Sequence, residues 1–364
     1  MKGKKVLIIL NDLIGGGIQR IFVNIANDFA EAGLETELLL GKKYGVYFDM
    51  LKPGIPVHEL NAVNLFQYIR KLPAFLKDKD YTHIFTASDY ISVATVLAKK
   101  KLKFPAKIIA TLHYNLPYQL SIIPQTQRAW IKYLNRHYIS KADEIVAVSN
   151  GVADGFRKIV GNRKTDNLRT IYNPVFDDSL YAMALEKVEE DYFEKGMITL
   201  INVARLQEQK NQRLLINAFQ ILSRQKDNLQ LLIAGTGALE QELRNQINEL
   251  GLQEKIYLIG FKQNPFAYIA KSDLFVLSSS SEGLPTAIIE SLALGINVVS
   301  TYCGAEEILE DGKFGWLAEN NNAELLAAGI KNALLHKHDT KFLQERAMLF
   351  HKKNIIPQYF DLIR

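Results

Sequence analysis

Two acidic residues at a predicted helix start carry the chemistry that is most readily assigned in this chain. Four serines (278–281) follow an apolar run, 274–277, that is typical of a buried parallel strand, and Pro285 is typical of a first helical turn. The amides of a helix N-terminus carry partial positive charge and can bind a phosphate. Glu282 and Glu290 bracket this position, and because carboxylates repel an anion, they suit the hydroxyl groups beside it, such as those of a ribose and a hexose. The segment therefore predicts a nucleotide-sugar site.

Two cations stand at the end of another predicted strand. Arg205 and Lys210 follow the apolar run 197–203. At a strand's carboxyl end both can reach a diphosphate, the arginine as a planar fork and the lysine as a point charge. Taken alone, two such charges are more often simply solvated in a loop.

A glycine loop follows the first predicted strand. The apolar run 6–10 leads into Gly15, Gly16 and Gly17, ahead of an amphipathic helix over 18–32. Without side chains, a ligand can approach this backbone closely. The glycines lack the spacing of the dinucleotide pattern, so a tight strand-to-helix turn is the alternative.

A histidine and a pair of aspartates are further candidates for binding a substrate or a metal. His113 lies just past the predicted strand 107–111, and ligands bind at the carboxyl ends of such strands, which favours a site role over a structural one. Asp78 and Asp80 have a spacing that could hold a divalent metal, but they stand at a charged helix end without other ligands. We interpret them as solvated surface, and no metal is expected.

The composition is that of an ordinary globular protein. A chain of 364 residues with 48% hydrophobic and 23% charged residues is sufficient for two domains. Its one cysteine, Cys303, permits no internal disulfide and indicates a reducing compartment. The N-terminal apolar run is too short for a signal peptide, and no stretch approaches a membrane span. We expect a soluble, cytoplasmic protein.

The charge is unevenly distributed. Residues 1–180 contain 25 Lys+Arg against 16 Asp+Glu, a net +9, whereas the remainder has 19 against 23, a net −4. Basic charge attracts phosphate-rich partners, and without a nucleic-acid module we favour an anionic membrane surface over nucleic acid; an evenly solvated basic surface is the alternative. Two basic amphipathic stretches, Tyr68 to Lys79 and Leu120 to Lys141, could lie in a lipid interface, although such helices more often pack on their own sheet. The run Lys99 to Lys103 could add attraction to lipid.

Strand and helix patterns alternate through both halves of the chain. This alternation predicts an α/β protein with parallel sheets covered on both faces. The acidic stretch after Pro174, about residues 174–196, is the predicted domain linker. The predicted strands are 6–10, 36–40, 83–86, 107–111, 144–148, the segment from Leu168 to just before Asn173, 197–203, 229–234, 255–259, 274–277 and 296–300.

The two-glutamate segment resembles the signature of retaining glycosyltransferases of family 4, with seven residues between the acids and Gly-Leu-Pro after the first. The resemblance covers nearly the whole chain, and it implies the GT-B architecture, two Rossmann-like doubly wound domains facing across a cleft. Residues 1–175 would bind the acceptor and 196–345 the nucleotide sugar, and 346–364 would form a terminal helix crossing back toward the first domain.

The resemblance also implies residue roles. Glu282, His113, Arg205 and Lys210 match catalytic positions, and Gln19 stands where the family often has an acidic residue. The donor-binding positions that the resemblance implies are Gly15, Gly16, Gly17, Arg205, Lys210, Gly235, Lys262, Glu282, Gly283, Leu284, Pro285, Thr286 and Glu290.

The implied reaction is transfer of a hexose or N-acetylhexosamine from a nucleotide diphosphate sugar, with UDP-sugar favoured, to a hydroxyl of a glycan or glycolipid acceptor. Retention of configuration, no metal or other cofactor, and a lipid-linked acceptor in surface polysaccharide or glycolipid assembly complete the expectation. A nucleotide-sugar 2-epimerase and a non-catalytic, nucleotide-sugar-binding partner of another transferase are the alternatives. A hydrolase fits less well, because the anion-binding surroundings favour a phosphate leaving group.

Overall fold

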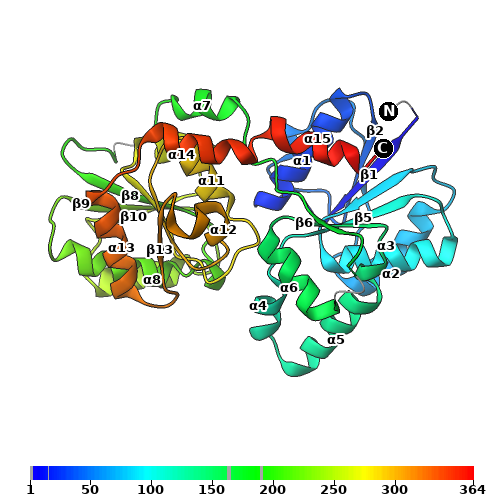
Figure 1. Cartoon of the computed structure of the whole chain (residues 1–364), viewed down its shortest axis with the longest axis horizontal. Coiled ribbons are helices and arrows are strands. Elements are labelled where there is room, and N and C mark those ends of the chain that lie inside the picture. The colour runs from blue at the N-terminus through cyan, green and yellow to red at the C-terminus, as the bar shows by residue number, and fades with distance from the viewer. Residues whose placement is uncertain (1–2, 15, 162–164, 189–191) are drawn as a thin grey trace. The chain divides into compact units, whose positions relative to one another are not determined.

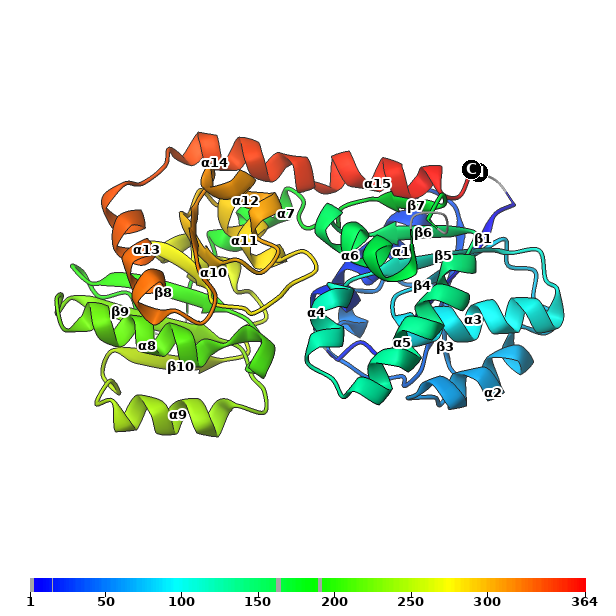
Figure 2. The same ribbon diagram turned by 60° about the horizontal axis from the view of Figure 1, so that its bottom comes forward.

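The computed structural model describes residues 3–14, 16–161, 165–188 and 192–364 (Figures 1 and 2). The chain forms two compact units: unit 1 contains Met1–Pro174 and Lys353–Arg364, and unit 2 contains Val175–Lys352. Each unit has its own sheet and core, so each is described separately.

Unit 1 is built on a parallel sheet. Its strands are β1 (Lys5–Leu10), β2 (Glu35–Leu40), β3 (Val57–Glu59), β4 (His83–Thr86), β5 (Lys107–Leu112), β6 (Glu144–Ala147) and β7 (Leu168–Thr170). They lie in the order β3-β2-β1-β4-β5-β6-β7, so the direction of strand addition reverses between β1 and β4. The helices of unit 1 are α1 (Gly17–Glu31), α2 (Leu65–Leu76), α3 (Asp89–Leu102), α4 (Leu116–Ser121), α5 (Gln125–His137), α6 (Asn150–Val160) and α15 (Lys352–Asp361).

Alternate residues of β1 enter two different cores, because successive side chains of a strand point to opposite faces. Val6 and Ile8 join the core cluster that contains α1 and α15, whereas Leu7 and Ile9 join the cluster that contains α2 and α3. The last helix, α15, is thus an integral part of unit 1 and lies beside α1 (Figures 1 and 2). The rings of Phe29 in α1 and Phe360 in α15 have centroids 5.3 Å apart.

Unit 2 repeats this plan. Its strands are β8 (Ile198–Val203), β9 (Leu229–Ala234), β10 (Ile256–Gly260), β11 (Leu274–Leu277), β12 (Val298–Thr301) and β13 (Trp316–Ala318), in the order β10-β9-β8-β11-β12-β13. Here the order reverses between β8 and β11. The helices are α7 (Ser179–Ala184), α8 (Gln212–Ser223), α9 (Glu240–Glu249), α10 (Phe266–Lys271), α11 (Thr286–Ala293), α12 (Glu306–Leu309), α13 (Ala323–Leu335) and α14 (Thr340–Ala347).

The segment predicted as a linker belongs to unit 2. Within residues 174–196 the chain forms α7, whose Leu180 is buried, and Phe176 forms a bridge with His351. The domain change therefore falls at residues 174 and 175 on the way out and at 352 and 353 on the return. An acidic composition without glycine or proline could not distinguish a linker from a segment that packs through a few apolar side chains.

The two predicted amphipathic helices differ in what they bury. Helix α2 packs Tyr68, Leu72 and Leu76 into the core, as expected of a helix that covers its own sheet. In α5, Asn135 is the one buried residue. The same sequence pattern therefore has two different structural outcomes.

Candidate active site

The predicted donor residues gather at the reversal point of the second sheet. Arg205 and Lys210 lie in the loop after β8, and Glu282 lies in the loop after β11, the neighbouring strand. In parallel α/β sheets, ligands bind outside the carboxyl ends of the strands where the strand order reverses. The fold thus brings residues 72 positions apart into one site.

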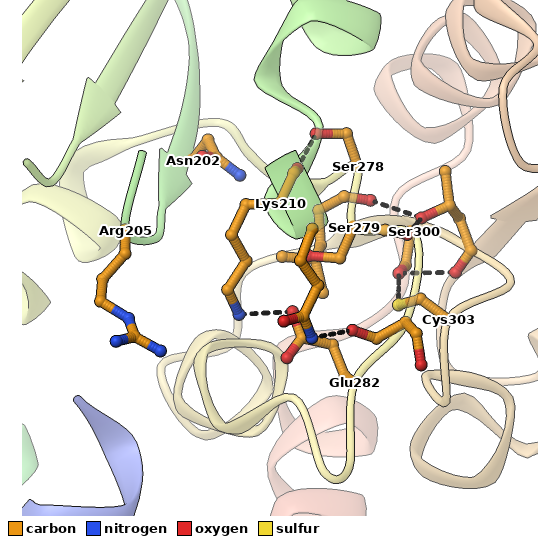
Figure 3. Close-up of polar contacts among 12 residues, drawn as sticks. Asn202, Arg205, Lys210, Ser278, Ser279, Glu282, Ser300 and Cys303 are labelled. Atoms are coloured by element: carbon orange, nitrogen blue, oxygen red, sulfur yellow. Dashed lines mark hydrogen bonds and ion pairs between the residues drawn. The ribbon is translucent and has the colours of Figure 1, made fainter. Parts of the chain in front are cut away.

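Three hydrogen bonds join these two loops. Ser280 donates its backbone N–H to the carbonyl of Gln209 over 2.8 Å, and Gln209 Nε2 donates to the carbonyl of Ser281 over 2.5 Å. Ser278 Oγ donates to the carbonyl of Lys210 over 3.0 Å (Figure 3). The buried serines of the predicted small-residue loop therefore fix the position of the cation-bearing loop.

Lys210 and Glu282 form an ion pair at this junction. The lysine Nζ lies 2.5 Å from Glu282 Oε1, and the two side chains are only 19% and 11% exposed. An ammonium group has three donors, so Lys210 retains donors for a phosphate while it holds the carboxylate. Arg205 is exposed, and Figure 3 shows its guanidinium apart from this pair.

Glu282 is also held through its backbone. Its N–H donates to the carbonyl of Cys303 over 2.5 Å. Gly304 has φ +105°, and a Cβ at this position would lie 2.9 Å from the Glu282 carbonyl oxygen, too close for a side chain. Burial raises the pKa of the Cys303 thiol to about 12, and its Sγ lies 3.6 Å from Ser300 Oγ. Cys303 is therefore a small structural residue behind the site, because a neutral buried thiol is a poor nucleophile.

The glycines after β9 are required by the chain itself. A Cβ on Gly235, at φ +145°, would lie 2.0 Å from the carbonyl oxygen of Ala204, and one on Gly237 would lie 2.2 Å from that of Leu206. These carbonyls belong to the Arg205 loop. Gly235 therefore lets the backbone pack behind Arg205, a role that needs no ligand and that the sequence alone did not indicate.

Helix α11 begins one residue later than expected. Thr286 is its first residue, and Pro285 precedes it in extended conformation. The residues between Glu282 and the helix, Gly283, Leu284 and Pro285, are all buried. Glu290 is the fifth residue of α11 and is 4% exposed. A carboxylate this deeply buried needs polar partners.

Lys262 follows β10 in the same unit. Its Nζ lies 5.2 Å from the ring centroid of Tyr268, and the preceding Phe261 is 52% exposed. Lys262 is half-buried, and it lies near the carboxyl end of β10 because it stands two residues after Gly260, the last residue of that strand.

In unit 1 the glycine loop follows β1, at the reversal point of the first sheet. Gly15 lies outside the described residues; Gly16 has φ +131°, a conformation that favours glycine, and Gly17 begins α1. Gln19, which stands where the resembling family often has an acidic residue, donates from Nε2 to Asp12 Oδ1 over 3.3 Å. The glycine loop therefore has a carboxylate beside Gln19, that of Asp12, which precedes the glycines in sequence.

His113 lies buried at the end of β5. Thr111 Oγ1 donates to the carbonyl of Thr86 over 2.8 Å, so its contact of 2.7 Å with His113 Nε2 requires the proton on that nitrogen. Nδ1 then has a free lone pair and no partner among the described residues. Burial lowers the pKa of His113 to about 3, so the ring is neutral. It can accept a hydrogen bond from a hydroxyl group.

Two residues near the first reversal point were not predicted. Tyr90 donates its hydroxyl to Asn11 Oδ1, which links α3 to the loop after β1. Asp89 stands in the first turn of α3, and burial raises its pKa to about 6, opposed by a hydrogen bond from Asn135. The sequence signal was weak, because an acidic residue after Ser88 reads as an ordinary helix start.

No group of three or more potential metal ligands occurs in the part of the chain that the structure describes. Asp80 of the Asp-x-Asp segment instead pairs with Lys5 over 2.9 Å, and its side chain is 81% exposed. Nor does any described helix have the length and apolar character needed to cross a bilayer.

Family comparisons agree with this architecture. The glycosyl transferases group 1 family matches residues 184–348, and glycosyltransferase family 4 matches residues 15–178. Together these matches span both units. The chain therefore belongs to the family 4 glycosyltransferases, with the GT-B fold.

Two individual relatives match only part of this chain. An uncharacterized glycosyltransferase of Methanocaldococcus jannaschii is 41% identical over 36% of this chain and 34% of its own length. A Campylobacter jejuni 4-α-N-acetylgalactosaminyltransferase, named for an N-acetylgalactosamine-N,N'-diacetylbacillosaminyl-diphospho-undecaprenol acceptor, is 35% identical over 62% of this chain and 60% of its own. The chain thus matches about a third and three fifths of the lengths of these two relatives.

Among solved structures, HepE of Anabaena in complex with UDP and glucose has a TM-score of 0.82 at 21% identity, with 99% of both chains covered. WaaG, a glycosyltransferase involved in lipopolysaccharide biosynthesis, has a TM-score of 0.77 at 14% identity over 98% of this chain and 99% of its own. At these identities the comparison shows the fold.

Proposed function

We propose that this protein is a retaining, metal-independent glycosyltransferase that moves a hexose or N-acetylhexosamine from a nucleotide diphosphate sugar, with UDP-sugar favoured, to a lipid-linked glycan. The observation that carries the proposal is the junction of Arg205, Lys210 and Glu282 beside the start of α11. Two cations, a held carboxylate and a helix N-terminus at a sheet reversal point suit a diphosphate attached to a sugar.

In this mechanism the donor's diphosphate is the leaving group, and its negative charge grows as the glycosidic bond breaks. Arg205 and Lys210 stabilise that charge, together with the amides that begin α11. Lys210 remains bonded to Glu282 while it does so, which ties the carboxylate to the departing phosphate. Glu282 then orients sugar hydroxyls, Glu290 holds ribose hydroxyls, and the neutral His113 accepts from a hydroxyl through Nδ1.

The acceptor class is supported by the relatives and by charge. The Campylobacter jejuni relative described above has a name that specifies a diphospho-undecaprenol acceptor. A second N-acetylgalactosaminyltransferase of that organism, named for a diNAcBac-PP-undecaprenol acceptor, is 26% identical over 99% of this chain and 98% of its own length. The net charge of +9 in residues 1–180 suits an acceptor held at an anionic membrane surface on its cytoplasmic side. The structure of Anabaena HepE in complex with UDP, which has the same fold, supports a uridine nucleotide as the donor.

The proposal is tested with a panel of UDP-, GDP- and ADP-sugars. Binding should raise the thermal stability of the protein, by about 2.7 kcal/mol for a ligand at 100 times its dissociation constant. Nuclear magnetic resonance of the product made from the best donor should show the α-anomer from an α-linked donor. An inverted anomer would exclude retention, and stabilisation by none of the sugars would exclude the donor class.

A further inference from the structure

One segment of unit 1 carries basic residues without any acidic ones. Between Asp89 and Asp143, residues 90–142 contain nine lysines and arginines and no aspartate or glutamate. This charge equals the whole net excess of +9 in residues 1–180. The attraction for anionic partners is therefore concentrated in this segment, which spans α3, β5, α4 and α5.

Helix α5 presents an aromatic face to solvent within this segment. Trp130 and Tyr133 are 50% and 45% exposed, and their rings stack with centroids 5.8 Å apart. His137 extends the row at 4.5 Å from Tyr133. In the preceding turn, Ile122 is 65% exposed. Apolar groups of this size gain free energy by leaving water.

The basic residues flank this aromatic face. Lys132 and Arg136 are exposed on α5 at helical spacing of four, and Lys141 follows shortly after the helix. Tryptophan and tyrosine prefer the level of lipid headgroups, and lysine and arginine reach anionic phosphates there. The combination matches a helix that lies in a lipid interface.

Internal hydrogen bonds hold the turn between α4 and α5 in place. Arg128 donates from Nε to the carbonyl of Ile123 over 2.8 Å and from Nη2 to that of Ser121 over 2.9 Å. Arg136 Nη2 donates to the carbonyl of Ile159 at the end of α6 over 3.1 Å. These hydrogen bonds tie the α4–α5 turn together and join α5 to the end of α6, which lies beside it (Figures 1 and 2).

The other basic candidates are less suitable. Helix α2 buries its apolar face in the core through Tyr68 and Leu72. Lys99 of the lysine run is engaged by Asp143 at 2.6 Å and by the carbonyl of Ala106 at 2.8 Å. The structure thus distinguishes α5 from α2, which has the same sequence pattern, and shows that Lys99 of the lysine run is engaged within unit 1.

We infer that the α4–α5 hairpin, residues 116–141, docks unit 1 on an anionic lipid bilayer, with Trp130, Tyr133 and Ile122 at headgroup depth and Lys132 and Lys141 on lipid phosphates. The inference deepens the proposed function, since a lipid-linked acceptor requires the enzyme at the membrane. Its test measures membrane contact and is independent of turnover.

The chain has two tryptophans, so a Trp316→Phe variant leaves Trp130 as a single fluorescent reporter of the hairpin. Vesicles of phosphatidylcholine with 30% phosphatidylglycerol should shift its emission to the blue, and brominated lipids should quench it. Vesicles of phosphatidylcholine alone, or high salt, should reduce both effects. Unchanged emission with anionic vesicles at low salt would overturn the inference.

Variants test the surface itself in vesicle co-sedimentation. Trp130→Ser with Tyr133→Ser should weaken binding at least tenfold, and Lys132→Gln with Lys141→Gln should weaken it comparably. Phe66→Ser is the matched aromatic control, because Phe66 in α2 is 75% exposed in the same unit. Lys100→Gln with Lys101→Gln is the matched charge control.

Both control variants should keep at least half of the wild-type affinity for vesicles. Equal losses from the control and hairpin variants would refute the surface. Release of nucleoside diphosphate from a UDP-sugar should stay unchanged in every variant. An absence of release in the wild type, alongside hairpin-dependent vesicle binding, would reject the enzyme and leave the docking surface standing.

Discussion

Replacing Lys210 by alanine should affect stability and turnover together, whereas replacing Arg205 should affect turnover alone. Lys210→Ala leaves Glu282, only 11% exposed, without its cation. Breaking a fully buried pair costs about 3–5 kcal/mol, and with the lysine 19% exposed we expect about 2–3 kcal/mol. For a unit of this size that loss lowers the melting temperature by about 4–12 °C. Arg205 is exposed, so its removal should cost less than about 0.5 kcal/mol.

The assay follows unit 2 alone. In a Trp130→Phe background the remaining tryptophan, Trp316, lies in β13 with its ring 4.7 Å from that of His338, so its fluorescence reports the unfolding of unit 2. Combining Lys210→Ala with Glu282→Gln should restore part of the lost stability, because no unpaired carboxylate remains. Both single cation variants should lower turnover by about two to three orders of magnitude. Equal melting temperatures for the two, with no coupling in the double variant, would refute the ion pair.

Three further perturbations probe other parts of the account. The pKa of His113 is about 3 in the folded protein against 6.5 in the unfolded chain, so the unfolded state takes up a proton first as pH falls. The stability that the neutral ring contributes is therefore lost between about pH 6.5 and 3, and His113→Gln should flatten the pH dependence of the unfolding free energy by up to about 1.4 kcal/mol per pH unit. An unchanged slope in urea titrations from pH 4 to 6 would contradict it. Gly235→Ala should lower the free energy of unfolding by about 2–4 kcal/mol, because the new Cβ meets the Ala204 carbonyl. Gly251→Ala, at φ +66° with nothing within 4 Å of the new Cβ, should lower it by about 1 kcal/mol. Similar losses of stability from both variants would argue against the close approach at Gly235. Transfer should continue in EDTA, since charge on the diphosphate is assigned to Arg205 and Lys210, and loss of turnover that manganese restores would show a required metal.

The sequence was sufficient to predict the parallel α/β fold, because that fold depends on local signals, whereas the location of the site stays a prediction. Apolar runs mark the buried strands, and polar or small residues mark their carboxyl ends. Two three-residue edge strands, β3 (Val57–Glu59) and β13 (Trp316–Ala318), give too little of this signal and were missed; they form by pairing with β2 and β12. Their existence depends on neighbours that a short window does not contain.

Contacts inside the site could not be predicted, because strand order is not encoded locally. The pairing of Lys210 with Glu282 exists because β8 and β11 are neighbours, although β9 and β10 lie between them in sequence. The fit of Gly235 behind Ala204 has the same origin. Amphipathic periodicity likewise shows that a helix has an apolar face but not what covers it. The apolar face of α2 is buried in the core, whereas that of α5 is largely exposed.

The most direct test of the central claim is release of nucleoside diphosphate from UDP-sugars by the purified full-length chain, with and without a diphospho-undecaprenol-linked glycan. The account predicts slow release from the donor alone, a large acceleration when the lipid-linked glycan is added, and loss of both in Lys210→Ala. Tight binding without any release would point to a non-catalytic partner, and conversion of the free donor to its 2-epimer would point to an epimerase. Either result would contradict the assignment of a transferase.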